Sequence, residues 1–288
     1  MRLPFPIPFV LLALFAGCTV PGETEDAGAV AMASSAGSFG IVRVERTMEP
    51  DALTAQPRAL LGAAFARYKG IDGLAVTGLL GGRMTTVDTC ALAGEDAGAF
   101  ADPAADVELL DVGEIEVRVA GTRTRMLARM FPDLAGMVGG VFYAEDGTLG
   151  PARADVDEYV LSAEGADIPG FEVVVVAPQG LTTVTFGGRA AEAVHRLSRE
   201  SDLELQWDAG DPRDRIEVDL VAGGDVLQCL ARDDGFFAVP SDILARLGAD
   251  SEARAVLGRV RTQVFDATGL DAAWVSVGST TAYTLALE

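Results

Sequence analysis

The stretch Ile216-Glu217-Val218-Asp219-Leu220-Val221, followed by Val226-Leu227-Gln228-Cys229-Leu230, decides the fold class of this chain. In the first run apolar and polar residues alternate, which is the period of a β-strand with one buried face. Between the two runs lies Ala222-Gly223-Gly224-Asp225, and paired glycines favour a tight turn because they adopt positive φ without a steric penalty. The stretch therefore predicts two adjacent strands joined by a short turn.

The residues on either side repeat this pattern of short strands and turns. Seven short strand candidates fill residues 181–288, with turn chemistry between them and a tryptophan, Trp207, in an early strand. This density of short strands favours a β-sandwich. After Pro240, Ser241 and Asp242 can cap a short helix. The strand candidates are 194–197, 203–207, 216–221, 226–230, 236–239, 255–265 and 273–287.

Two stretches carry resemblances to known families. Leu203-Glu204-Leu205-Gln206-Trp207 resembles the second strand of immunoglobulin-like and fibronectin-type modules, whose tryptophan lies in the core. That resemblance implies a sandwich and says nothing of function. The run from Cys229 to Pro240 resembles a recurrent stretch of uncharacterised bacterial lipoproteins, which implies a surface lipoprotein and carries no catalytic residues.

The first half of the chain also indicates strands. Residues 39–46, 107–113, 114–119, 122–130 and 171–176 are strand-like, whereas 73–80 is a short apolar run interrupted by glycines and stays unassigned. Residues 60–68 suit either a strand or, through their alanines, a helix, and Gly62 and Gly70 favour the strand. Pro178-Gln179-Gly180 breaks the series, so we expect a domain boundary near residue 180. The predicted fold is all-β, with two tandem β-sandwich domains at 39–180 and 181–288.

The N-terminus predicts export and a lipid anchor. Arg2 and the apolar residues up to Ala16 form a signal peptide over 1–17 that is too short to span a bilayer. Leu14-Phe15-Ala16-Gly17-Cys18 resembles the lipobox of bacterial lipoproteins, although Phe15 stands where that family usually has an aliphatic residue. The resemblance implies lipidation of Cys18, and the alternative is a plain secretory peptide.

The residues after Cys18 predict where the body lies. Thr19 follows the cysteine. An Asp at this position would resemble an inner-membrane retention signal. Because Thr19 stands there instead, the resemblance implies the outer membrane. Residues 18–38 are small and polar without a helical period, so we expect a flexible tether that holds the body clear of the headgroups.

The overall charge excludes one class of partner. The 288 residues include 22 Lys and Arg against 43 Asp and Glu, which gives a net charge of −21. Such a chain repels phosphate backbones, so nucleic-acid binding is not expected. Anionic headgroups repel it as well, so the lipid on Cys18 alone must hold the protein to a membrane.

Two cysteines remain besides Cys18. In an oxidising compartment Cys90 and Cys229 can form one disulfide that ties the first half of the chain to the second. The alternative is two separate buried thiols that act as small apolar side chains.

Catalytic and metal-binding patterns are sparse. His195 is the single histidine, which excludes zinc sites that need several imidazoles, and no Gly-x-Ser-x-Gly motif is present. Asp208, Asp211 and Asp214 form a candidate Ca²⁺ cluster, and the alternative is ordinary turn chemistry with solvated acids. No other cofactor is expected.

These observations favour a non-enzymatic, lipid-anchored binding or assembly module of the cell envelope, with an envelope protein or polysaccharide as partner. The alternatives are a carbohydrate-active hydrolase with paired carboxylates and a purely structural envelope protein. An exposed strand edge or apolar patch would favour a protein partner. An exposed aromatic platform would favour carbohydrate, and a cleft with two facing carboxylates would favour hydrolysis.

Overall fold

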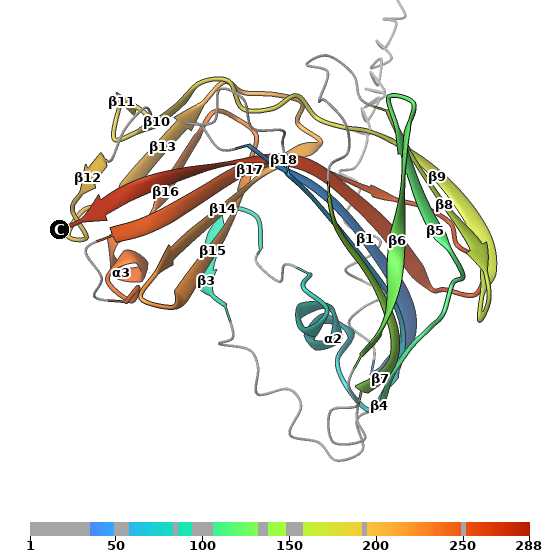
Figure 1. Cartoon of the computed structure of the whole chain (residues 1–288). Coiled ribbons are helices and arrows are strands. Elements are labelled where there is room, and N and C mark those ends of the chain that lie inside the picture. The colour runs from blue at the N-terminus through green and yellow to red at the C-terminus, as the bar shows by residue number, and fades with distance from the viewer. Residues whose placement is uncertain are drawn as a thin grey trace, which may run out of the picture.

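The computed structural model describes residues 35–48, 58–82, 86–93, 106–131, 138–147, 158–191, 195–248 and 252–288. These residues lie mostly in strands (Figure 1), so the all-β fold class is confirmed. Residues 1–17, Cys18 and nearly all of the expected tether lie outside the described ranges, and their roles stay predictions. Within those ranges no helix has the length and apolar character needed to cross a bilayer.

The strands form one large mixed sheet and one small sheet of four strands. The elements of the first half are β1 (Ala36–Met48), β2 (Arg58–Lys69), α2 (Gly73–Leu79), β3 (Thr89–Leu92), β4 (Asp106–Leu109), β5 (Ile115–Val119), β6 (Thr122–Phe131), β7 (Val138–Gly147), β8 (Glu158–Gly165) and β9 (Pro169–Val176). Those of the second half are β10 (Val184–Phe186), β11 (Arg189–Ala190), β12 (His195–Leu197), β13 (Leu203–Trp207), β14 (Asp214–Ala222), β15 (Asp225–Arg232), β16 (Phe236–Val239), α3 (Ser241–Leu244), β17 (Glu252–Val264) and β18 (Ala272–Leu287).

The large sheet has the order β3-β15-β14-β17-β18-β1-β2-β4-β7-β6-β5-β8-β9, with β12 added beside β18. The hairpin expected from the opening stretch is present, because β14 and β15 pair from Arg215↔Arg232 to Ala222↔Asp225. Gly223 and Gly224 form its turn with φ values of 60° and 90°, a conformation that side chains with a Cβ rarely adopt.

Two hydrophobic cores give each half a sandwich-like arrangement. In the first half, β1, β2, β7 and part of β18 pack against β5, β8 and β9, with Phe65, Tyr143 and Tyr159 among the buried side chains. In the second half, β14, β15, β17 and the rest of β18 pack against β10, β13 and β16. Trp207 lies in this second core with 6% of its surface exposed, as the sequence pattern predicts.

The large sheet continues across the expected boundary near residue 180. β1 pairs in parallel with β18 over ten residues, from Phe39↔Ala272 to Met48↔Thr281. β3, also from the first half, pairs with β15 of the second. Val275 and Val277 of β18 belong to the first core, Cys90 of β3 packs against the second, and the two halves share one bent sheet (Figure 1).

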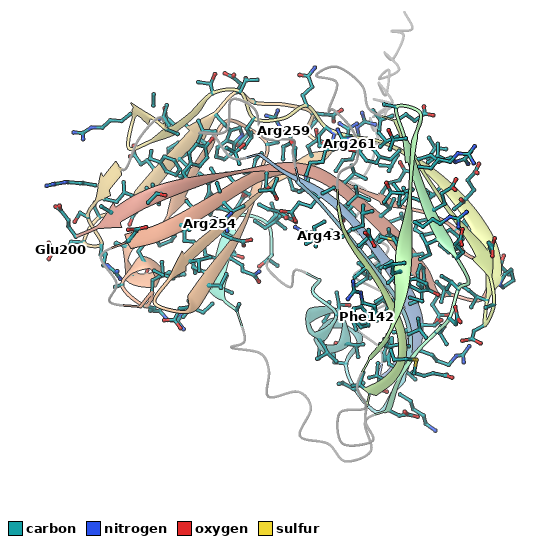
Figure 2. The ribbon with its side chains drawn as sticks, viewed as in Figure 1. Arg43, Phe142, Glu200, Arg254, Arg259 and Arg261 are labelled. Atoms are coloured by element: carbon teal, nitrogen blue, oxygen red, sulfur yellow. A yellow bond between two sulfur atoms is a disulfide. The ribbon has the colours of Figure 1, made fainter. Side chains whose placement is uncertain are left out.

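Three long side chains on one face of β17 also join the halves. These side chains lie at alternate positions of β17 and reach main-chain carbonyls at the end of β9 and just beyond it. No backbone hydrogen-bond ladder links β17 to β9. Figure 2 shows Arg259 and Arg261 at this junction. The bonds run from Gln263 Nε2 to Val174 O (3.1 Å), from Arg261 Nη1 to Val176 O (3.5 Å) and from Arg259 Nη1 to Gln179 O (3.1 Å).

The helices are short. α3 follows Pro240, as the sequence predicts. The unassigned run 73–80 forms α2, which begins where the Asp72 side chain accepts a hydrogen bond of 2.7 Å from the backbone N–H of Leu74. Val76 of α2 is fully buried in a third apolar cluster with Phe39 of β1, so α2 covers part of the sheet face opposite the first core.

Candidate functional site

The structure places His195 in β12, where it pairs with Leu285 of β18. Its side chain lies outside the described part of the structure, so His195 stays without an assigned role. The lipidation candidate Cys18 also lies outside the described ranges.

The three aspartates of the calcium hypothesis do not converge on a cation site. Asp208 accepts a hydrogen bond of 2.8 Å from Thr182 Oγ1, and Asp211 pairs with Arg213 at 2.5 Å. Asp214 is buried and pairs with Arg261 at 2.7 Å. No group of three His, Cys, Asp or Glu side chains in the described ranges is placed to hold a metal. The arrangement therefore argues against Ca²⁺ binding here.

The pKa values of these carboxyls follow their contacts. The Arg213 side chain and its backbone N–H lower the pKa of Asp211. Burial raises the pKa of Asp214, although Arg261 acts in the opposite direction. Thr182 lowers the pKa of Asp208. Each aspartate thus has a structural partner within the second half of the chain.

A buried ion pair lies next to this cluster. Arg259 Nε lies 2.7 Å from Asp233 Oδ2, with 5% and 0% of the two side chains exposed. Trp207 Nε1 donates a hydrogen bond of 2.8 Å to Asp233 Oδ1. Because a buried charge is tolerated only when it is paired and hydrogen-bonded, this network holds the end of the second core in place.

Cys90 and Cys229 form a disulfide, so the first of the two alternatives for these residues holds in the structure. The two residues lie directly opposite each other on β3 and β15. Cys229 is fully buried in the second core and Cys90 is partly buried. The bond therefore fastens a short edge strand of the first half to the sheet of the second half.

The outer side of the first half, opposite its main core, presents an exposed apolar surface. The registers place Gly62 of β2, Ala144 of β7 and Leu127 of β6 in one row, with Arg43 of β1 beside Gly62. Figure 2 shows Arg43 and Phe142 on this side of the sheet. Leu127 is 55% exposed, and Leu60 of β2, on the same face, is 54% exposed. We call Leu60, Gly62, Leu127 and Ala144 the outer patch.

A charged cluster borders the outer patch. Arg43 pairs with Glu217 of β14 at 2.5 Å and with Glu45 at 3.1 Å, and Glu45 accepts a hydrogen bond from Thr280. Burial disfavours the charged guanidinium, but the two carboxylates outweigh burial and raise the pKa of Arg43. This cluster ties β1 to β14, which lies beyond β18 and β17 in the large sheet.

β6 has an unpaired edge next to the outer patch. Its residues 122–126 pair with β5, whereas residues 127–131 pair only with β7 on the other side of the strand. β6 thus passes from one layer of the sandwich to the other, as strands do at sandwich corners. The backbone of residues 127–131 that faces away from β7 has no partner strand among the described elements. Met130, on this edge, is 75% exposed.

Arginines alternate along β6. Arg123, Arg125, Leu127 and Arg129 lie on one face of the strand and are all exposed. Arg125 pairs with Glu114 at 2.9 Å, and Arg123 lies 3.9 Å from Glu116. These ion pairs are exposed and contribute little to the free energy of folding. Arg129 makes no ion pair within the described ranges. In a chain of net charge −21, this strand is a basic stripe.

The sequence pattern of β6 was visible, but its unpaired edge was not. The run 122–130 reads as a strand, and its alternating arginines can be seen by eye. Which residues of that strand pair with β5 and which with β7 depends on distant parts of the chain, so only the structure reveals the unpaired edge.

Of the large apolar side chains that the structure shows as exposed, only Phe236 is aromatic, at 50% exposure.

Comparison with known proteins adds no family to this description. No protein-family model, no curated protein and no solved structure matches the chain.

Proposed function

We propose that this protein is a lipid-anchored, non-enzymatic assembly module of the cell envelope that binds an extended segment of a protein partner along β6. The observation that carries the proposal is the unpaired edge at residues 127–131 with Leu127 and Met130 exposed beside it. Strands with free edges pair with added strands, and native proteins usually protect such edges unless they use them.

The chemistry of β6 defines the partner. Main-chain hydrogen bonds along the edge supply affinity, and side chains on alternate residues supply specificity. Leu127 and Met130 provide apolar contacts on the two faces of the strand. The alternating arginines favour Asp or Glu at alternate positions of the bound segment, because partner carboxylates can replace the exposed ion pairs at little cost.

An anionic membrane surface is the alternative partner for the arginines of β6. The charge of −21 repels such a surface over most of the body. A narrow acidic segment that contacts only β6 avoids this repulsion, so a protein segment fits the surface better.

The anchor is tested separately from the binding surface. We expect the Cys18→Ser variant to leave the membrane fraction and appear in the soluble fraction, because anionic headgroups repel a body of net charge −21. Retention of the variant in the membrane pellet would contradict the lipid anchor.

The binding surface is tested by affinity capture from the native envelope after chemical crosslinking. Leu127→Glu places a charge on the exposed strand without altering a buried side chain, and it should remove the captured partner. Phe236→Glu is the matched control, since Phe236 is similarly exposed but lies in the second half. Equal capture by both variants would exclude β6 as the contact.

A further inference from the structure

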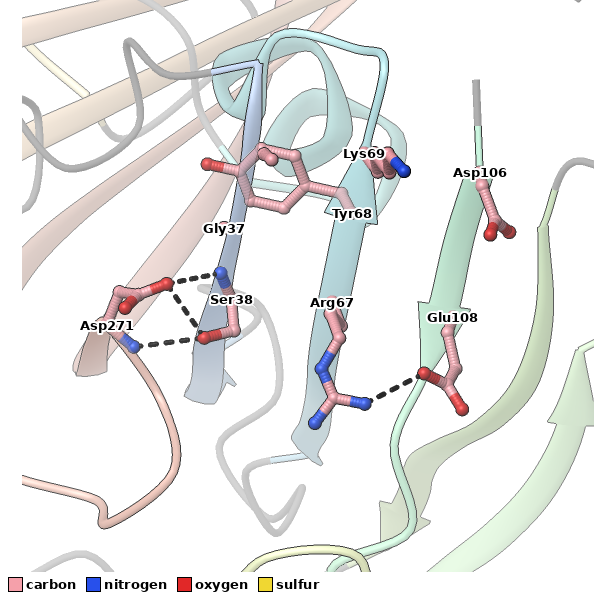
Figure 3. Close-up of a pocket in the computed structure, with 9 residues that line it drawn as sticks. Gly37, Ser38, Arg67, Tyr68, Lys69, Asp106, Glu108 and Asp271 are labelled. Carbon is pink, nitrogen blue, oxygen red and sulfur yellow. Dashed lines mark hydrogen bonds and ion pairs between the residues drawn. The ribbon is translucent and has the colours of Figure 1, made fainter. Parts of the chain in front are cut away.

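A cavity of about 490 Å³ lies at one end of the first half, away from the outer patch (Figure 3). It is formed where β1 begins, β2 ends and β4 begins, together with Asp271 just before β18. These segments are far apart in sequence, and the parallel pairing of β1 with β18 brings Asp271 to the start of β1.

Asp271 is held rigidly at the wall of this cavity. Its Oδ2 accepts hydrogen bonds from Ser38 N (2.8 Å) and Ser38 Oγ (2.9 Å), and its own N–H donates to Ser38 Oγ at 3.1 Å. Figure 3 shows these three bonds. The second carboxylate oxygen, Oδ1, accepts no hydrogen bond from a described residue. A fixed acceptor is therefore available to a ligand.

Tyr68 contributes a second polar group. The residue is 3% exposed, and its ring packs 5.8 Å from that of Phe39. Its hydroxyl end lies over Gly37, where an added Cβ would come within 2.8 Å of the phenol oxygen (Figure 3). The hydroxyl lines the cavity and has no hydrogen-bond partner among the residues that the structure describes. The hydroxyl is open to the cavity and can therefore form a hydrogen bond with a ligand.

The protonation state of Tyr68 makes it a donor. Burial, and then the nearby charges of Asp271 and Asp72, raise the pKa of its phenol. The hydroxyl keeps its proton and can donate to a ligand oxygen while Asp271 accepts from a ligand hydroxyl.

The cavity wall carries charges of both signs. Arg67 and Glu108 pair at 3.0 Å, and Lys69, Asp106 and Asp271 also line the wall. A neutral ligand with adjacent hydroxyl groups adds no charge to this mixed wall, and it can satisfy the fixed acceptor and the phenol donor together.

We infer that this cavity binds a small neutral polyhydroxylated molecule, such as one sugar unit, between the Asp271 carboxylate and the Tyr68 hydroxyl. The inference is independent of the proposed binding along β6, because the two surfaces share no residue.

The test is saturation-transfer NMR on the purified full chain with glucose, galactose, N-acetylglucosamine and glycerol as neutral probes. Phosphate and ethanolamine serve as charged probes. We expect at least one neutral probe to bind. Tyr68→Phe should weaken its binding roughly two- to tenfold, the equivalent of one neutral hydrogen bond. Tyr283→Phe, in the second core, is the control and should leave binding unchanged.

Tyr68→Phe keeps the ring that packs on Phe39, so the variant should fold, and a thermal melt verifies it. If none of the neutral probes binds, the inference is wrong. Equal binding by wild type and Tyr68→Phe, or binding of phosphate or ethanolamine alone, would also overturn it.

Discussion

Removal of the Cys90–Cys229 disulfide should lower the stability of the whole molecule. The bond closes a chain segment of 139 residues. In the chain-entropy description, a crosslink across a loop of this length restricts the unfolded chain and stabilises the folded state by about 5 kcal/mol. Because a typical domain is stable by roughly 5–15 kcal/mol, this is a large share of the total.

The assay is equilibrium urea unfolding of the oxidised wild type and the Cys90→Ala/Cys229→Ala variant. Wild type treated with a dithiol reductant is the control for the lost side-chain volume, since it keeps both sulfur atoms. We expect the variant and the reduced protein to agree within about 1 kcal/mol, since the crosslink supplies most of the effect. Both should lie several kcal/mol below the oxidised protein.

A difference below about 1 kcal/mol between the oxidised protein and the variant would refute this reasoning, because the predicted loop entropy is several times larger. Thiol labelling of the denatured, unreduced protein supplies the covalent check. Neither Cys90 nor Cys229 should react.

Two further perturbations test the polar contacts. Arg259→Met leaves the Asp233 carboxylate buried without its cation and should destabilise the fold by about 3–5 kcal/mol in urea unfolding. Arg259→Met/Asp233→Leu should recover part of this loss, and a neutral single variant would contradict the role of the pair. The Tyr143 hydroxyl and a backbone N–H lower the pKa of Asp111 from its usual 3.8. This contribution is present above pH 3.8 and is lost as the pH falls through the folded-state pKa. The melting temperature should therefore fall more steeply with acid in wild type than in Asp111→Asn, and parallel pH profiles would contradict the assignment.

Local patterns predict the strands of this fold well. The alternation in β14 and the paired glycines after it predict the hairpin with β15, and Trp207 lies in the core as expected. These features depend on residues close in sequence, where side-chain period and turn conformation are decisive.

The pairing of distant strands was not predictable in the same way. Nothing in the alternation of residues 39–46 indicates that β1 pairs in parallel with β18. This pairing joins the two halves into one sheet, and it creates the cavity by bringing Asp271 to Ser38. Likewise, a cluster of aspartates in sequence suggests a cation site, whereas in the fold Asp208 bonds Thr182, Asp211 pairs with Arg213 and Asp214 pairs with Arg261 of β17.

The most direct test of the proposed function is site-specific photo-crosslinking in the native envelope. A photoreactive side chain replaces Ala128 on the unpaired edge of β6, and Glu204 on β13 of the second half is the control position. We expect one dominant protein adduct from position 128, absent from position 204, with the crosslinked peptide rich in Asp or Glu. No adduct at position 128, or the same adduct at both positions, would contradict binding along β6.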